Sequence, residues 1–279
     1  MMNPAQSQRR RAAFTMIEIA ISLAVIGFAL VAIIGILPSG MNVQKENREQ
    51  TIINQDYSVL ADAIRSGARG FDDLTNYIIA ITNYVTEYSI LGTPVNNWVN
   101  GYTYKSSSTT PKFPLTNGYR IVGLLSTPRF TPDPLAAGKS AGGYLSNYVV
   151  AFVRSMSGNA GEKYPQTNSS VQDLALTYRL VTEILDHTDY DRNWTNYTVN
   201  GIGTNEMTMR SNYWMYARNL QTNLHDVRMI FRWPLLANGD AAGGRQAYRM
   251  MIGGRLLATN DIGIPLYFFE SRNYVKATP

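Results

Sequence analysis

Residues 9–37 read RRRAAFTMIEIAISLAVIGFALVAIIGIL, and this stretch contains the strongest structural signal in the chain. Its last nineteen residues, Ile19–Leu37, include no charged side chain, with Glu18 before them and Pro38 after them. An α-helix rises about 1.5 Å per residue, so this segment would be about 30 Å long, which is the thickness of the hydrocarbon core of a bilayer. We therefore predict a membrane-spanning helix.

The charges that flank this segment predict its orientation. Arg9, Arg10 and Arg11 lie upstream, whereas residues 45–49 on the downstream side mix two basic with two acidic side chains. Because basic residues are retained on the cytoplasmic side, the arginine cluster is expected in the cytoplasm and the rest of the chain outside it.

Two ordinary kinds of N-terminal segment fit less well. A secretory signal has an apolar region of about 7 to 15 residues that ends at a small-residue cleavage site, whereas this run is longer and leads into a polar helical segment. An uncleaved anchor leaves Glu18 unexplained, since a carboxylate at the edge of an apolar helix costs about 2–3 kcal/mol on insertion.

Residues 9–18, RRRAAFTMIE, together with the apolar run after them, resemble the leader and cleavage site of type IV prepilins and type II secretion pseudopilins. The resemblance covers about residues 9–65. It implies that a prepilin peptidase cuts between Ala13 and Phe14, that the amine of Phe14 is methylated, and that Glu18 becomes the fifth mature residue. The family prefers Gly before the cut, so Ala13 is expected to slow processing.

The same resemblance implies a role for Glu18 in assembly, and electrostatics supports that role. When such helices pack side by side in a filament, each buried terminal ammonium needs a counter-charge, which the carboxylate of a neighbouring subunit can supply. An unpaired buried charge costs more than the pair gains, so the pairing would set the register between subunits.

Beyond Pro38 the helical pattern returns. Pro38, Ser39 and Gly40 are expected to interrupt or kink the helix. Ile53, Tyr57, Leu60 and Ile64 then recur at helical spacing, and the helix is expected to end near Gly67 or Gly70.

From residue 71 the periodicity favours strands separated by clusters of Pro, Gly, Asn and Ser. Residues 76–90 fit either a helix or a pair of strands. The predicted strands are Tyr119–Leu125, Tyr144–Met156, Leu174–Ile184, Asp226–Trp233 and Ile264–Glu270. We therefore expect an α+β, pilin-like fold, with a long N-terminal helix packed on a C-terminal antiparallel sheet.

This pattern predicts four regions along the chain. They are a leader (1–13), a transmembrane and filament-core helix (14–37), an extension of that helix (38–70) and a β-rich head (71–279).

Composition restricts the function classes. The chain has no cysteine, which excludes disulfides and cysteine-based metal sites or catalysis. The formal charge of +5 includes three arginines of the leader, and without residues 1–13 there are 22 basic against 20 acidic side chains. So small a net charge does not predict a nucleic-acid partner.

Other motifs are incomplete. Asp189, Asp191 and Asn193 have the alternate spacing that begins a calcium loop, but Trp194 and Asn200 occupy the positions of its glycine and bidentate glutamate. A solvated acidic turn is the alternative. No recognisable nucleophile motif accompanies the two histidines, so neither an enzyme nor a cofactor is expected.

The sequence thus favours a structural subunit, of the minor pilin or pseudopilin kind, in a type IV pilus or type II secretion filament. Its expected partners are prepilin peptidase, other pilin or pseudopilin subunits and inner-membrane lipid. It would cross the inner membrane once with its head exported, and then join a periplasmic or surface filament. The alternative is a monomeric, membrane-anchored extracytoplasmic binding or adhesion protein.

Overall fold

The computed structural model describes most of the chain. The described residues are 14–67, 71–89, 91–103, 113–115, 117–132, 143–157, 175–187, 204–236 and 238–276. The chain divides into two compact units, with the boundary between Thr51 and Ile52.

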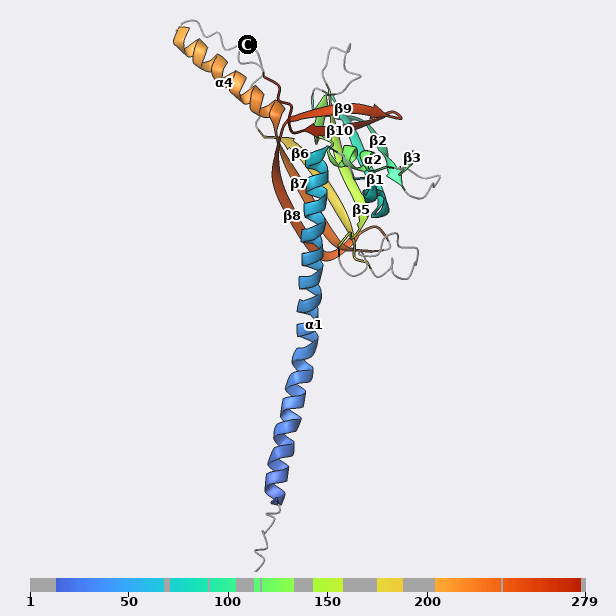
Figure 1. The fold of residues 1–279 in the computed structure, drawn as a ribbon, viewed down its shortest axis with the longest axis vertical. Coiled ribbons are helices and arrows are strands. Elements are labelled where there is room, and N and C mark those ends of the chain that lie inside the picture. Colours follow the sequence, from blue (N-terminus) through green and yellow to red (C-terminus); the bar gives the residue numbers. More distant parts are fainter. Residues whose placement is uncertain are drawn as a thin grey trace, which may run out of the picture. The chain divides into compact units, whose positions relative to one another are not determined.

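One long helix, α1 (Met16–Ser66), begins the described chain (Figure 1). Of the interruption or kink expected at Pro38, the interruption is not observed, since the helix runs through this residue. Proline removes one helical hydrogen bond, and here the loss is confined to a single turn within fifty-one helical residues. By length and composition the apolar part of α1 can cross a membrane.

The second unit contains a mostly antiparallel sheet with the strand order β3-β2-β1-β5-β6-β7-β8. Strand β4 pairs with β5, and the short β2–β3 pair is parallel. A separate two-stranded sheet joins β9 to β10. The strands are β1 (Ile78–Tyr88), β2 (Pro94–Thr103), β3 (Phe113–Pro114), β4 (Phe130–Pro132), β5 (Tyr144–Arg154), β6 (Thr177–Asp186), β7 (Leu224–Leu235), β8 (Ala241–Gly253), β9 (Arg255–Asp261) and β10 (Ile264–Glu270).

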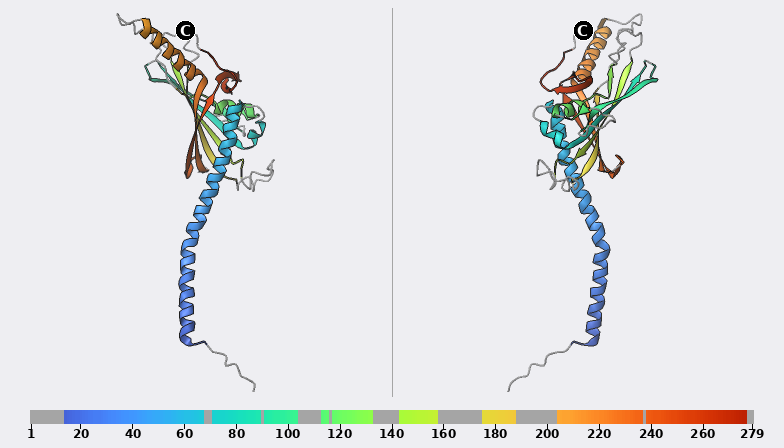
Figure 2. Two further views of the ribbon diagram at one scale, coloured as in Figure 1. Left: turned by 60° about the vertical axis from the view of Figure 1, so that its left-hand side comes forward. Right: turned by 90° about the vertical axis from the view of Figure 1, so that its right-hand side faces the viewer.

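Three shorter helices accompany the strands in the described chain. They are η1 (Asp72–Asn76), α2 (Gly118–Leu125) and α4 (Thr204–Asn223). Residues 52–66 of α1 lie with α2 on one face of the main sheet (Figure 2). The α+β prediction, a long N-terminal helix packed on an antiparallel sheet, is therefore confirmed.

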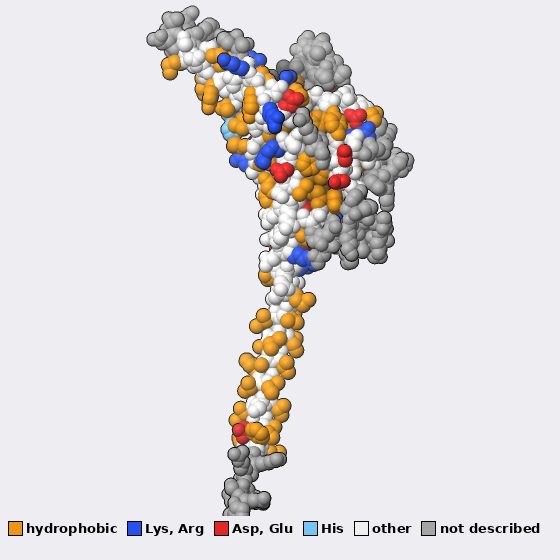
Figure 3. All heavy atoms as spheres, in the orientation of Figure 1, with side chains coloured by type: hydrophobic (Ala, Val, Ile, Leu, Met, Phe, Trp, Pro, Cys, Tyr) orange, Lys and Arg blue, Asp and Glu red, His pale blue; other side chains and the backbone are white. Residues whose placement is uncertain are grey.

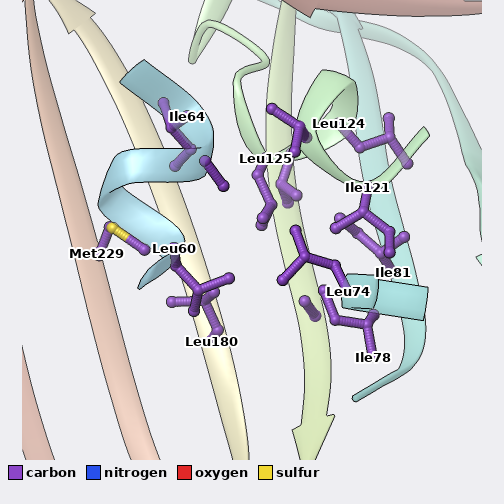
Figure 4. Close-up of a cluster of buried hydrophobic side chains, with 14 of the residues drawn as sticks. Leu60, Ile64, Leu74, Ile78, Ile81, Ile121, Leu124, Leu125, Leu180 and Met229 are labelled. Carbon is purple, nitrogen blue, oxygen red and sulfur yellow. The ribbon is translucent and has the colours of Figure 1, made fainter. Parts of the chain in front are cut away.

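The apolar stripe of α1 forms the centre of the core. Leu60 and Ile64 are fully buried and contact a cluster to which α2, β6 and β7 also contribute (Figure 4). Tyr57 stacks on Tyr248 of β8, with ring centroids 4.0 Å apart. Burying a side chain of the size of Leu60 or Ile64 stabilises the fold by about 1.5–3 kcal/mol. The apolar residues therefore recur at helical spacing because they pack into this core.

Four of the five predicted strands are present, with small differences at their ends. In β7 the alternation is clear, because Val227, Met229 and Phe231 are buried whereas Arg228 and Arg232 are exposed. Residues 76–90 form mainly a single strand, β1. The prediction of a strand at Tyr119–Leu125 is wrong, since these residues belong to helix α2.

Helix α2 shows why the strand prediction failed. Asn117 caps its N-terminus, with its side-chain oxygen accepting a hydrogen bond from the amide of Arg120 at 3.1 Å. Ile121, Val122, Leu124 and Leu125 are all buried, so no polar face marks a helical period. A short apolar run of this kind does not distinguish a strand from a buried helix.

Gly123 allows α2 to pack closely against β10. A Cβ atom at this position would lie 2.8 Å from both Leu266 Cβ and Phe268 Cζ. We expect Gly123→Ala to lower the free energy of unfolding by about 1–3 kcal/mol through overpacking. Urea denaturation of the full-length protein in neutral detergent, followed by tryptophan fluorescence, measures this change.

Gly243 is the matched control, because a Cβ there would meet nothing within 4 Å. Gly243→Ala should leave the free energy of unfolding within about 0.5 kcal/mol of the parent value. Equal effects of the two substitutions would contradict the close packing of α2 against β10.

Candidate functional site

The N-terminal end of α1 holds the best candidate for a functional site. The carbonyl of Thr15 accepts hydrogen bonds from the amides of Glu18 and Ile19, at 3.1 and 3.2 Å. The Thr15 hydroxyl lies 3.4 Å from the Glu18 amide and 3.4 Å from Glu18 Oε2. Thr15 and Glu18 thus form a local pair related to a capping box, which the sequence analysis did not single out although the Thr-x-x-Glu spacing was visible.

Glu18 is accessible at the start of α1. It is exposed, and it lies in the first turn of α1, where the partial positive charge of the helix N-terminus favours an anion. Both side-chain contacts with Thr15 are at the long limit of hydrogen bonding, so they hold the carboxylate weakly. A stronger cationic partner could therefore displace Thr15.

The helix beyond Glu18 presents an apolar surface on all sides. Glu18 is the only charged residue between positions 14 and 44. Large apolar side chains are exposed along the whole segment, including Phe14 at 76% and Phe28 at 80%, and they cover this part of α1 in Figure 3. So continuous an apolar surface requires lipid or protein around it, because water would solvate it poorly.

The structure describes only part of the predicted processing region. Phe14 and Glu18 are among the described residues, and three residues lie between them in the sequence. Arg9, Arg10, Arg11 and Ala13 lie outside the described residues. The topology and cleavage roles of these four residues remain predictions.

The calcium-loop residues Asp189, Asp191 and Asn193 also lie outside the described residues. Within the described ranges, no group of three or more His, Cys, Asp or Glu side chains is arranged to hold a metal ion. His225 is buried, with Nδ1 3.4 Å from Asp186 Oδ1 and its ring against Phe269. This pair supplies two possible ligands, which are too few for a metal site by themselves.

Asp226 has a structural role in an arginine cluster on the sheet. Burial disfavours its charge, but hydrogen bonds and charge from Arg249 and Arg228 outweigh that effect and hold the pKa of Asp226 below its ordinary value. The Arg249 Nε atom lies 2.8 Å from Asp226 Oδ1, and Arg228 lies 3.3 Å from Oδ2. Asp226 thereby neutralises part of the positive charge of β7 and β8.

Asp56 is a buried carboxylate that the sequence analysis missed. It lies on the apolar side of α1 and is fully buried. Its two oxygens accept hydrogen bonds from the amides of Met156 and Ser157 and from the Tyr178 hydroxyl, each at 3.0 Å. Its position three residues after Ile53 and four before Leu60, within the apolar stripe, was the signal available in the sequence.

The pKa of Asp56 is raised above its ordinary value. Desolvation by burial is the largest cause, and hydrogen bonds from Ser157, Met156 and Tyr178 oppose it in part. Asp56 therefore joins α1 to the end of β5 at an electrostatic cost. Its contacts satisfy two main-chain amides and one hydroxyl of the head.

Comparisons of the chain with protein-family models, with curated proteins and with solved structures found no match. The functional assignment therefore depends on the geometry and chemistry of the chain itself.

Proposed function

We propose that the chain is a subunit of a type IV pilin-like filament, either a pilus or a secretion pseudopilus. The observation that carries this proposal is the combination of an apolar helix exposed on all sides with a single carboxylate in its first turn. Lipid covers such a helix while the subunit is in the membrane, and neighbouring helices cover it in a filament.

Assembly of this kind exchanges lipid contacts for protein contacts. Since lipid chains are as apolar as the helix surface, the exchange releases little hydrophobic free energy, and polar contacts decide how subunits align. Glu18 is the only ionic group of residues 14–44 available for this purpose. After cleavage before Phe14, the new ammonium group of one subunit would pair with Glu18 of another.

Thr15 gives the free subunit a way to hold Glu18 before assembly. The hydroxyl contact at 3.4 Å provides the carboxylate with a local donor in the absence of a neighbour. An ammonium ion makes a shorter and stronger charge-assisted hydrogen bond than a neutral hydroxyl does. The carboxylate would therefore leave Thr15 when a neighbouring amine arrives.

The N-terminus of the mature protein tests this proposal most directly. The full chain is expressed with and without a prepilin peptidase, and the membrane-bound product is examined by N-terminal mass spectrometry. We expect peptidase-dependent loss of residues 1–13 and a methylated Phe14. Ala13→Gly should increase the processed fraction, and Ala13→Leu should lower it, because the preferred residue before the cut is small.

Retention of Arg9–Arg11 in the presence of an active peptidase would contradict the filament proposal. That result would favour a monomeric protein anchored by an uncleaved helix. Ala13→Gly controls for a peptidase that fails merely because alanine precedes the cut.

A further inference from the structure

The two faces of the main sheet differ in what covers them. Residues 52–66 of α1, together with η1 and α2, lie on the face formed by buried residues such as Leu180 and Met229. On the opposite face, which we call the outer face, none of these three helices lies (Figure 2). Side chains alternate along each strand. The outer face therefore consists of the even-numbered positions of β5 and β7, those of β1 from Ala80 onward, and the odd-numbered positions of β6 and β8.

Three arginines form a row across one half of the outer face. Arg179 of β6 pairs in register with Arg232 of β7, which pairs with Arg245 of β8. Adjacent strands are about 4.8 Å apart, so three guanidinium groups lie on neighbouring strands of one face. Like charges directly opposite one another destabilise a sheet, and a bound anion would remove that cost.

The arginine row is not neutralised within the described part of the chain. The carboxylates of the outer face pair with other arginines, Glu183 with Arg129 and Asp226 with Arg228 and Arg249. The Nε atom of Arg179 is buried and has no hydrogen-bond partner among the described residues. The row therefore carries positive charge that no carboxylate among the described residues compensates, and Arg232 and Arg245 are exposed.

The other half of the outer face carries aromatic rings. Tyr84 of β1 lies opposite Tyr148 of β5, and Tyr88 lies opposite Tyr144. Tyr84 is 47% exposed and Phe130, beside Tyr144, is 57% exposed. The five rings form two groups, Tyr84 with Tyr148, and Tyr88 with Tyr144 and Phe130. The uncovered face of an antiparallel sheet is ordinarily polar, so exposed rings are unusual there.

Arg129 connects the aromatic and basic halves. Its Cζ atom lies 5.6 Å from the ring centroid of Tyr148 and 6.0 Å from that of Phe130, while Nη1 lies 3.7 Å from Glu183 on β6. Glu183 lies four positions from Arg179 on the same face of β6. Seven arginines lie on or beside the outer face against two carboxylates, although the whole chain without residues 1–13 has only two more basic than acidic residues.

We propose that the outer face binds single-stranded nucleic acid, with phosphates on the arginine row and bases stacked on the exposed tyrosine and phenylalanine rings. Basic side chains that follow the backbone and aromatic rings that stack on bases are the two components of sequence-tolerant single-strand binding. A duplex keeps its bases paired and stacked, so it would use only the arginines. An acidic protein segment would likewise leave the rings without a specific role.

Binding to a fluorescein-labelled oligodeoxythymidylate of about 20 nucleotides tests the proposal. The full-length protein is held in neutral detergent, and anisotropy is measured between about 50 and 200 mM salt, the range over which phosphate contacts weaken strongly. We expect binding that is tighter for the single strand than for a duplex of equal length. Its affinity should fall as salt rises.

The combined variant Arg179→Gln, Arg232→Gln and Arg245→Gln tests the row. We expect the affinity to fall at least tenfold and the magnitude of the salt slope to fall by about 2, since each phosphate contact to a single strand contributes about 0.7. The variant also removes like-charge repulsion, so its unfolding transition should be unchanged or slightly raised. The control variant Arg65→Gln, Arg255→Gln and Arg272→Gln makes the same charge change away from the outer face.

The combined variant Tyr84→Ala and Tyr148→Ala tests stacking. It should weaken binding about fivefold or more, because stacking on one base contributes about 1–3 kcal/mol to the free energy of binding. The salt slope should not change, because no charge is removed. An unchanged unfolding transition shows that the sheet is intact.

Three outcomes would overturn the proposal. They are no binding at 50 mM salt, equal losses in the two arginine variants, or an affinity for polyglutamate that matches the oligonucleotide and does not respond to loss of the tyrosines. The last outcome would assign the face to an acidic protein partner. All of these results are independent of leader cleavage and of filament formation.

Discussion

Replacing Glu18 with alanine is expected to leave the protein in the membrane but to lower its recovery in filaments at least tenfold. Without the carboxylate, each terminal ammonium buried between helices would lose its counter-charge, and an unpaired buried charge typically costs about 3–5 kcal/mol. Membrane insertion should be unchanged or slightly favoured, because Glu18 is the only charged group among residues 14–44.

The measurement compares the amount of subunit in membranes with the amount in sheared filaments, by immunoblotting of cells that make the assembly machinery. Glu18→Gln keeps the size of the side chain but removes its charge, so it should also fail to assemble. Ser22→Ala is a matched control in the same helix, since the Ser22 hydroxyl bonds only the carbonyl of Glu18. Normal incorporation of the Glu18→Ala subunit would rule out the role of Glu18 in register.

The second large effect is expected at Asp56. Asp56→Ala should lower the free energy of unfolding of the head by about 3–5 kcal/mol. It would leave the amides of Met156 and Ser157 and the hydroxyl of Tyr178 without their acceptor, and each unsatisfied buried donor costs about 1–3 kcal/mol. Urea denaturation of the full chain in neutral detergent measures the loss.

Asp62→Ala on the same helix is the control for Asp56→Ala. Asp62 is exposed and lies 3.6 Å from Arg65, which is also exposed, so its removal should change the free energy of unfolding by less than about 0.5 kcal/mol. If Asp56→Ala lowered the free energy of unfolding no more than Asp62→Ala does, the role of Asp56 in joining α1 to the head would be contradicted.

The pH dependence of stability gives an independent check on Asp56. Because the pKa of Asp56 is raised in the folded protein, the folded state binds its proton more tightly than the unfolded state does. This contribution to stability is fully present below the ordinary pKa of 3.8 and is lost as pH rises through the raised value. Relative to Asp56→Asn, the parent protein should therefore become less stable as pH rises over that interval.

Several features could be predicted from the sequence because their signals are local. The apolar run 19–37 is long and hydrophobic enough by itself to favour insertion into a membrane. Four predicted strands show alternation or clear boundaries within about ten residues. Helix α2 was predicted wrongly because Ile121, Val122, Leu124 and Leu125 are buried on every side. In that environment neither the helical nor the strand period appears in the sequence.

The amino-acid sequence by itself determined that this protein has an apolar, membrane-compatible helix with one carboxylate at its start, since helical rise and charge depend only on consecutive residues. Only the tertiary structure decided what Asp56 bonds and which arginines form a row. Arg179, Arg232 and Arg245 are distant in sequence and become neighbours through strand pairing. A net charge summed along the chain cannot reveal such a row, because electrostatic potential depends on distances in space.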